Sequence, residues 1–237
     1  MNILQRLINR LGNHHGIRPF PWSDPCELSE AGSDHRALFD TIHRRNYWGS
    51  DESISGGGST VSRTQAYAER LIALIGDEGF TTMFDAPCGD LNWMGRVIDE
   101  TAILYQGGDV SELALQAARA NRAGVNVRLF DLRNDEFPDA DFWHCRDCMF
   151  HLSFDDGLAV LRNFGRCTIP YALITTNTAR WLKNIDIETG GHRVTDLERA
   201  PYNLPKPLVR LKDYPSGKEF PRYVAMWWRE DIARAVG

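Results

Sequence analysis

The sequence predicts an α/β protein with a mostly parallel sheet and helices on both of its faces. From residue 80 onward, short apolar segments alternate with segments whose apolar residues recur at helical spacing. Strands that alternate with helices of this length favour parallel pairing through right-handed crossovers. The chain has 237 residues, of which 43% are hydrophobic, and this suits one domain with extensions.

Six apolar segments are predicted as strands, and five amphipathic segments as helices. The strands are expected at 82–86, 103–107, 125–130, 140–145, 171–176 and 223–228. The helices are expected at 34–45, 60–75, 93–100, 111–121 and 153–165. Ser111 and Ser153 begin the last two helices, because a serine oxygen accepts hydrogen bonds from the free N–H groups of a first turn.

Residues 1–60 are predicted to form an N-terminal helical extension that ends in a glycine-rich loop, and residues 61–237 form the α/β domain. Residues 2–11 have the pattern of an amphipathic helix, which either docks on the domain or faces a membrane surface or a partner. Pro19, Pro21 and Pro25 mark an irregular connection. The first residues have neither a long apolar run nor a cleavage site, so no signal peptide is expected.

The loop at 46–60 contains three consecutive glycines and two large aromatic residues. Such a loop is either a flexible linker or a backbone cradle for a ligand. A bare linker seldom has large aromatic side chains, which favours the cradle. Its candidate ligand contacts are Trp48, Ser53 and Gly58.

Net charge and cysteine content limit the possible partners. The net charge of −5 gives no global attraction to nucleic acid, and no segment has the length and apolar character of a membrane span. The cysteine count is odd (Cys26, Cys88, Cys145, Cys148 and Cys167), which favours reduced thiols in the cytoplasm. Cys145 and Cys148 have no second pair of ligands nearby in the sequence, so no metal site is expected. The oligomeric state is not readable from the sequence.

Three aspartates follow the first three predicted strands, where an open parallel sheet binds its ligands. Asp85 precedes a tight turn at Gly89, where the backbone can approach a ligand closely. Asp109 comes 20 residues after Gly89, the spacing at which a carboxylate accepts hydrogen bonds from ribose hydroxyls. Asp131 stands between apolar residues and suits an adenine amino group. Together these side chains predict an adenosine pocket.

The first turn argues against a nicotinamide dinucleotide. That ligand needs a Gly-x-Gly-x-x-Gly turn that places its diphosphate on a helix N-terminus. The turn at 86–91 has one glycine, and Asp90 stands where the diphosphate would lie. A carboxylate there repels a diphosphate but tolerates a sulfonium cofactor that carries an amino group.

Three motifs now suggest a family. Asp-Ala-Pro-Cys-Gly-Asp-x-x-Trp-Met at 85–94, Gly-Gly-Asp at 107–109 and Arg-Asp-Cys-x-x-His-Leu-Ser at 146–153 resemble class I S-adenosylmethionine-dependent methyltransferases. In particular, they resemble a bacterial subgroup linked to polysaccharide or sugar modification. The resemblance covers residues 46–228. Pro87 and Leu91 stand where that family often has glycines.

The resemblance implies a Rossmann-like, mostly parallel sheet of seven strands and S-adenosylmethionine as the cofactor. It implies methyl transfer to a hydroxyl of a sugar or another polar small molecule. The implied cofactor contacts in the domain are Asp85, Pro87, Gly89, Asp90, Trp93, Asp109, Val110, Asp131, Leu132 and Arg146.

The end of the fourth strand is where the resemblance places the reaction. His151 is the candidate general base, since an imidazole can take a hydroxyl proton near neutral pH. The alternative is a histidine that only bonds to backbone before the Ser153 cap. Arg146 and Asp147 are also candidate catalytic residues, and they either pair structurally or hold the acceptor.

Residues 177–220 are predicted to form a long, lid-like excursion over the sheet edge. Their candidate acceptor-binding residues are Asn177, Asn184, Asp186, His192 and Arg193. The excursion is either a shaped polar pocket or a solvated loop. Two other functions stay open: a nicotinamide-dependent oxidoreductase and a non-catalytic binding subunit with a methyltransferase-like fold.

Overall fold

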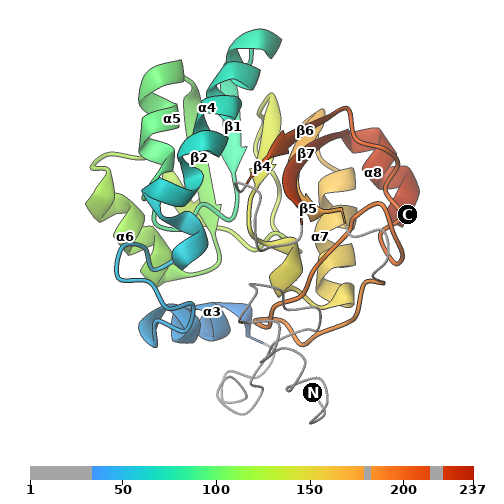
Figure 1. The fold of residues 1–237 in the computed structure, drawn as a ribbon, viewed down its shortest axis with the longest axis horizontal. Coiled ribbons are helices and arrows are strands. Elements are labelled where there is room, and N and C mark those ends of the chain that lie inside the picture. Colours follow the sequence, from blue (N-terminus) through green and yellow to red (C-terminus); the bar gives the residue numbers. More distant parts are fainter. Residues whose placement is uncertain (1–33, 179–182, 214–220) are drawn as a thin grey trace.

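The computed structural model describes residues 34–178, 183–213 and 221–237. The predicted helix at 2–11, the prolines at 19, 21 and 25 and Cys26 lie outside the described residues. The fold is a seven-stranded sheet with helices on both faces, as predicted (Figure 1). The strands run in the order β3-β2-β1-β4-β5-β7-β6, and β7 is antiparallel to both of its neighbours.

The strands are β1 (Thr82–Asp85), β2 (Leu104–Asp109), β3 (Val127–Leu129), β4 (Phe142–Cys145), β5 (Tyr171–Asn177), β6 (Val209–Lys212) and β7 (Arg222–Trp228). The helices are α3 (His35–Arg44), α4 (Val61–Glu78), α5 (Met94–Thr101), α6 (Glu112–Asn121), α7 (Phe154–Gly165) and α8 (Arg229–Val236). Two 3₁₀ turns, η2 (Gly57–Ser59) and η3 (Met149–His151), lie beside the site described below.

The buried core is divided between the two faces of the sheet, because neighbouring side chains in a strand point in opposite directions. In β1, Met83 packs with α4, α5 and α6, while Phe84 packs with α7 and α8. In β4, Phe142 and Trp143 divide in the same way. Figure 1 shows these two groups of helices on opposite sides of the sheet.

The predicted helix starts agree with the structure at three positions. Ser111 and Ser153 each accept a hydrogen bond from a backbone N–H in the first turn, and Asp34 does so for α3. Thr60 stands before α4 but makes no such side-chain bond.

Two elements differ from the expectation. The excursion at 177–220 contains β6, an edge strand of four residues that pairs only with β7. A four-residue strand at the edge of a sheet is too short to show a clear alternation of apolar and polar residues in the sequence. The helix α8 was not predicted either, because it follows β7 directly and has no side-chain cap.

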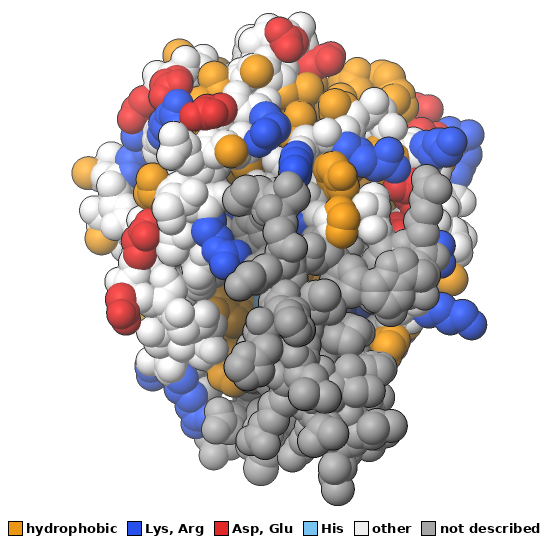
Figure 2. All heavy atoms as spheres, in the orientation of Figure 1, with side chains coloured by type: hydrophobic (Ala, Val, Ile, Leu, Met, Phe, Trp, Pro, Cys, Tyr) orange, Lys and Arg blue, Asp and Glu red, His pale blue; other side chains and the backbone are white. Residues whose placement is uncertain are grey.

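None of the helices in the described part of the chain combines the length and apolar character needed to cross a bilayer. Figure 2 shows acidic and basic side chains interspersed on one face of the molecule, around the grey residues.

Candidate functional site

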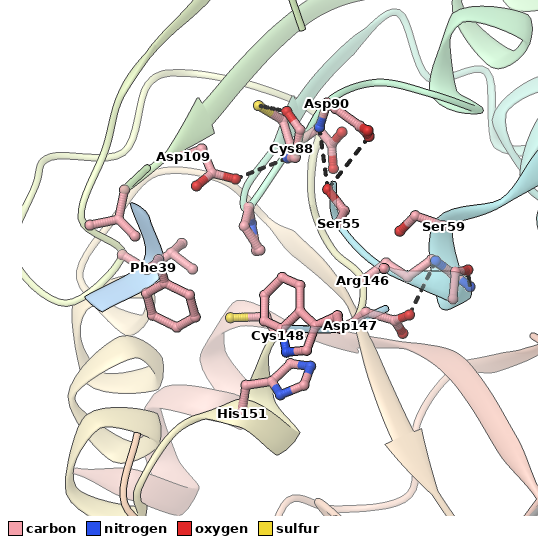
Figure 3. Close-up of a pocket in the computed structure, with 18 of the residues that line it drawn as sticks. Phe39, Ser55, Ser59, Cys88, Asp90, Asp109, Arg146, Asp147, Cys148 and His151 are labelled. Atoms are coloured by element: carbon pink, nitrogen blue, oxygen red, sulfur yellow. Dashed lines mark hydrogen bonds and ion pairs between the residues drawn. The ribbon is translucent and has the colours of Figure 1, made fainter. Parts of the chain in front are cut away.

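A cavity of about 270 Å³ lies at the carboxyl ends of β1, β2 and β4. Its wall includes Asp85, Asp109 and Asp131, so the structure brings the three predicted carboxylates to one place. The loop at 46–60 also lines it, through Trp48, Gly58 and their neighbours. In Figure 3, Asp109, Cys88 and Asp90 lie on one side of the cavity, and Cys148 and His151 lie on the opposite side.

Asp85 is buried at the end of β1 and already accepts two hydrogen bonds from the protein. The Tyr105 hydroxyl donates to Oδ2 over 2.8 Å, and His144 Nδ1 lies 2.6 Å from Oδ1. His144 Nε2 lies 2.9 Å from the Tyr67 hydroxyl, so a neutral ring satisfies both contacts. The hydrogen bonds from Tyr105 and His144 therefore fix the position of the Asp85 carboxylate in the wall of the cavity.

Asp109 is the last residue of β2, and it joins the turn after β1 to the start of α6. Its two oxygens accept from the backbone N–H of Gly89 and of Ser111, each over 2.9 Å. Burial raises the pKa of this carboxyl to about 6, although the two backbone hydrogen bonds oppose the shift. The position therefore favours a ligand that stabilises the ionised form.

Asp90 connects the first turn to the glycine-rich loop. Its Oδ2 accepts from Ile54 N–H over 3.0 Å, and Ser55 Oγ lies beside both Asp90 and Gly89. A Cβ at Gly89, whose φ is +57°, would come within 2.4 Å of Ser55 Oγ. Gly89 thus permits a close approach of the protein's own loop. Leu91 also adopts a positive φ, of 58°, where the resembled family often has glycine.

Asp131 differs from the other carboxylates because it has a cationic partner. Arg133 Nη2 lies 2.7 Å from Oδ2, and Arg133 also pairs with Asp156 over 3.1 Å. Burial opposes ionisation, but the hydrogen bonds from Arg133 outweigh it and lower the pKa of Asp131. Phe130 and Leu132 line the cavity beside it.

The charges around the cavity are unevenly compensated. Asp85, Asp90 and Asp109 are buried, and no lysine or arginine of the described residues forms an ion pair with any of them. In contrast, each arginine in the wall is paired with carboxylates: Arg133, Arg146 and Arg222. Burying unpaired charges is costly unless a ligand compensates them.

The opposite end of the cavity contains a network in which two arginines pair with two aspartates. Arg146 Nη2 lies 2.9 Å from Asp213 Oδ1, and Arg222 Nε lies 2.9 Å from Asp213 Oδ2. Both arginines also reach Asp147 Oδ2, over 3.3 and 3.2 Å. Arg146 additionally donates to the carbonyl of Gly58. The predicted pairing of Arg146 with Asp147 is thus present, but Asp213 is the closer partner.

Asp147 itself is an unusual residue. Its φ is +57°, a conformation that aspartate tolerates better than most residues. Its Oδ1 is buried and has no hydrogen-bond partner among the described residues, while the side chain as a whole is 17% exposed and lines the cavity. The Asp147 carboxylate therefore keeps unused acceptor capacity in a side chain that lines the cavity.

His151 lies on η3, between β4 and α7. Its Nδ1 is 2.7 Å from the carbonyl oxygen of Gly191, so Nδ1 carries the proton and Nε2 has the lone pair. Burial lowers the pKa of the ring to about 4, despite the opposing effect of that hydrogen bond. The ring also stacks on Trp48, with ring centroids 4.9 Å apart. The backbone bond of the second alternative is thus present, and it leaves Nε2 available, so His151 stays a candidate base.

Of the predicted cofactor contacts, Ser53 does not line the cavity; it is buried, and its Oγ accepts from Ser55 N–H. All the others line it: Trp48, Gly58, Asp85, Pro87, Gly89, Asp90, Trp93, Asp109, Val110, Asp131, Leu132 and Arg146.

Among the predicted acceptor-binding residues, only His192 lines the cavity. Asn177 accepts from Thr195 N–H, and Asn184 bonds to the backbone of Asp196. Arg193 is buried against the Tyr202 hydroxyl, and Asp186 accepts from Phe154 N–H. These four side chains hold the excursion in place, because a long irregular segment must satisfy its own backbone and buried groups.

Several wall residues were missed by sequence reasoning. Phe39 and His43 come from α3, which was predicted as a helix but with no position over the cavity. His144 lies within the predicted strand at 140–145, and Arg222 lies just before the predicted strand at 223–228. The only sequence signal was a histidine in an otherwise apolar strand, which is weak by itself. Phe39, His144 and Arg222 reach the site through tertiary packing.

The cysteines of the described residues are all free thiols: Cys88, Cys145, Cys148 and Cys167. Burial raises the pKa of Cys145 well above its ordinary value. Within the described ranges, no three His, Cys, Asp or Glu side chains gather in a metal-binding arrangement.

No protein-family model matches the sequence, and no curated protein matches it. Among solved structures, the chain is similar to magnesium protoporphyrin IX methyltransferase (ChlM) from Synechocystis PCC 6803 with bound SAH. The TM-score is 0.58 at 12% identity, and the match covers 82% of this chain and 97% of that one. An S-adenosylmethionine-dependent methyltransferase from Clostridium acetobutylicum ATCC 824 gives a TM-score of 0.51 at 12% identity, over 69% and 90% of the two chains.

The methyltransferase domain of bacterial CtHen1 matches less closely. Its TM-score is 0.43 at 17% identity, and the match covers 48% of this chain and 66% of that one, just under two thirds of its length. The chain therefore has the class I fold of S-adenosylmethionine-dependent methyltransferases.

Proposed function

We propose that the protein is an S-adenosylmethionine-dependent methyltransferase. The observation that carries this proposal is the group of three buried carboxylates, Asp85, Asp90 and Asp109, with no arginine or lysine partner among the described residues. A ligand with a sulfonium and an ammonium group compensates such charges. A dinucleotide diphosphate adds negative charge to the same wall.

The residues present fit the cofactor in its several parts. Asp109 would accept from ribose hydroxyls, and Asp131 with Phe130 and Leu132 would bind the adenine. Asp85 and the turn at Gly89 would hold the methionine portion. Arg146 lines the same cavity and joins it to the glycine-rich loop through the Gly58 carbonyl.

When bound, S-adenosylmethionine supplies a methyl group already activated on sulfur, so the protein mainly positions the reactants and removes a proton. His151 Nε2 would take the hydroxyl proton of the acceptor while the oxygen bonds to the methyl carbon and the carbon–sulfur bond breaks. The Gly191 carbonyl keeps the other ring nitrogen protonated, so the ring is held in the required tautomer. Water then takes the proton from His151.

We infer that the acceptor is a hydroxyl-bearing polar small molecule, such as a sugar. The support is the side chain of His192, together with the packing of the excursion onto η3 through the backbone pairs Gly190–His151 and Arg193–Phe150. The four free thiols of the described residues suit a reducing cytoplasm.

Titration calorimetry of the full chain with S-adenosylmethionine, S-adenosylhomocysteine, NAD⁺ and NADP⁺ tests the cofactor. We expect binding of the first two and none of the dinucleotides. Tighter binding of a dinucleotide would support the oxidoreductase instead. Release of S-adenosylhomocysteine with an acceptor panel of sugars, nucleotide sugars and glycan fragments then tests catalysis, and no release with any acceptor would favour the binding subunit.

A further inference from the structure

We propose that Asp147 and the stacked pair Trp48–His151 select an uncharged, ring-bearing acceptor whose hydrogen-bond donor binds the Asp147 carboxylate. This inference rests on the proposed function and specifies the class of acceptor. It is carried by three features of the cavity: an oxygen of Asp147 without a partner among the described residues, the charge network to which Asp147 belongs, and an aromatic wall.

The orphaned oxygen defines what the acceptor must offer. Asp147 Oδ2 is shared between Arg146 and Arg222, whereas Oδ1 is buried and has no hydrogen-bond partner in the part of the chain that the structure describes. An ionised carboxylate only accepts hydrogen bonds, so the matching ligand group is a hydroxyl or an N–H. The left-handed backbone at Asp147 places this carboxylate in the wall immediately after β4.

The charge network defines what the acceptor must lack. Arg146 and Arg222 face two carboxylates, Asp147 and Asp213, so these four side chains sum to zero charge. Arg133, the third arginine of the wall, is paired with Asp131 and Asp156. A phosphate or carboxylate on the acceptor would have to break one of these ion pairs.

The aromatic wall defines the shape of the acceptor. Trp48 stacks on His151, and Phe150 lies against His151 with ring centroids 4.5 Å apart. His192 completes the cluster, 5.1 Å from the Phe150 ring. All four side chains line the cavity, and flat aromatic faces bind planar rings or the C–H face of a sugar. Figure 3 shows His151 and Cys148 on this side of the cavity, with Asp147 close by.

Four small probes test the selection on the wild-type full chain saturated with S-adenosylhomocysteine. Phenol and methyl β-glucopyranoside have a ring and a donor, anisole lacks the donor, and phenyl phosphate adds an anion. Ligand-observed NMR titration gives their affinities. We expect phenol, methyl β-glucopyranoside or both to bind, and anisole and phenyl phosphate to bind about tenfold more weakly than phenol or not at all. The stronger of the two binders identifies the ring as planar or as a sugar.

Asp147→Asn tests the residue, since asparagine tolerates the left-handed backbone and preserves the side-chain shape. We expect about a tenfold loss of affinity for the donor probe. Asp99→Asn is the control, because Asp99 pairs with Arg122 on the surface and does not line the cavity. This control variant should bind the donor probe with an affinity within about threefold of the wild-type value. Melting curves and S-adenosylhomocysteine affinity establish that both variants are folded.

Equal binding of phenol and anisole, preferred binding of phenyl phosphate, or no binding of either donor probe would overturn the inference. So would equal losses in the two folded variants. If a variant does not fold, the wild-type probe series decides. Failure of S-adenosylhomocysteine itself to bind would instead contradict the proposed function.

Discussion

The two ends of the cavity handle charge in opposite ways. At the end formed by β1 and β2, Asp85, Asp90 and Asp109 are buried without arginine or lysine partners in the described residues. At the end formed by β4 and the excursion, Arg146 and Arg222 are matched by Asp147 and Asp213.

This difference teaches how one cavity can receive two unlike molecules. Uncompensated buried carboxylates make the first end selective for a cationic ligand. At the second end the arginines are already paired with carboxylates, so a charged acceptor would have to break an ion pair, and under the proposal hydrogen bonding and shape select an uncharged one.

His151→Ala should lower kcat by about 100-fold or more, because it removes the proposed general base. The affinity for S-adenosylhomocysteine should stay within about threefold, since the ring belongs to the acceptor end. Steady-state kinetics and calorimetry on the same preparation measure both. Added imidazole should restore part of the rate, and an unchanged kcat would exclude His151 as the base.

Asp109→Ala should weaken S-adenosylhomocysteine binding by about 10- to 100-fold, because a charged hydrogen-bond acceptor is lost. The Gly89 and Ser111 N–H groups also lose their shared partner. Asp131→Ala serves as the comparison, and its effect should be smaller since Asp131 is already paired with Arg133. A larger effect of Asp131→Ala would reverse the proposed ranking of the strand-end carboxylates.

The affinity for S-adenosylhomocysteine and the turnover rate should also depend on pH in different ways. The Asp109 carboxyl, whose pKa is raised to about 6, becomes protonated below that pH and loses its charge, so Kd for S-adenosylhomocysteine should rise about tenfold between pH 7 and pH 5. The His151 ring, whose pKa is lowered to about 4, stays neutral over this range. At saturating cofactor, kcat should therefore show no loss from His151 until about pH 4. A single shared midpoint for Kd and kcat would contradict the division.

Gly89→Ala should destabilise the protein by about 1 kcal/mol, because of the positive φ at this position and the contact with Ser55 Oγ. Ser55→Ala removes the oxygen that lies 2.4 Å from the added Cβ. The double variant should therefore lose less stability than the sum of the single variants, which denaturant unfolding can measure. If the stability losses of the two single variants add up in the double variant, the Ser55 side chain does not contact the Cβ added at position 89.

The apolar pattern and the spacing of the aspartates were enough to predict the layered sheet and the convergence of three carboxylates at one of its edges. The apolar segments of the sequence predicted the bounds of β1, β2, β4, β5 and β7 closely. The bounds of β3 were predicted less closely, because this strand is shorter than the apolar segment that contains it. Because parallel strands end at one edge, aspartates after successive strands had to converge, and no knowledge of packing was needed. The caps at Ser111 and Ser153 could also be predicted, because each cap bond joins residues only three positions apart in the sequence.

The arrangement at the opposite end of the cavity depends on contacts between residues far apart in the sequence. Asp213 meets Arg146 across 67 positions of sequence, and β6 reaches the sheet only because the excursion returns to pair with β7. Asn184 and Arg193 have residue types that suit ligand binding, but they satisfy the excursion's own polar groups. Whether a polar side chain binds a ligand or the protein depends on where an irregular segment folds back, and no local periodicity encodes that path.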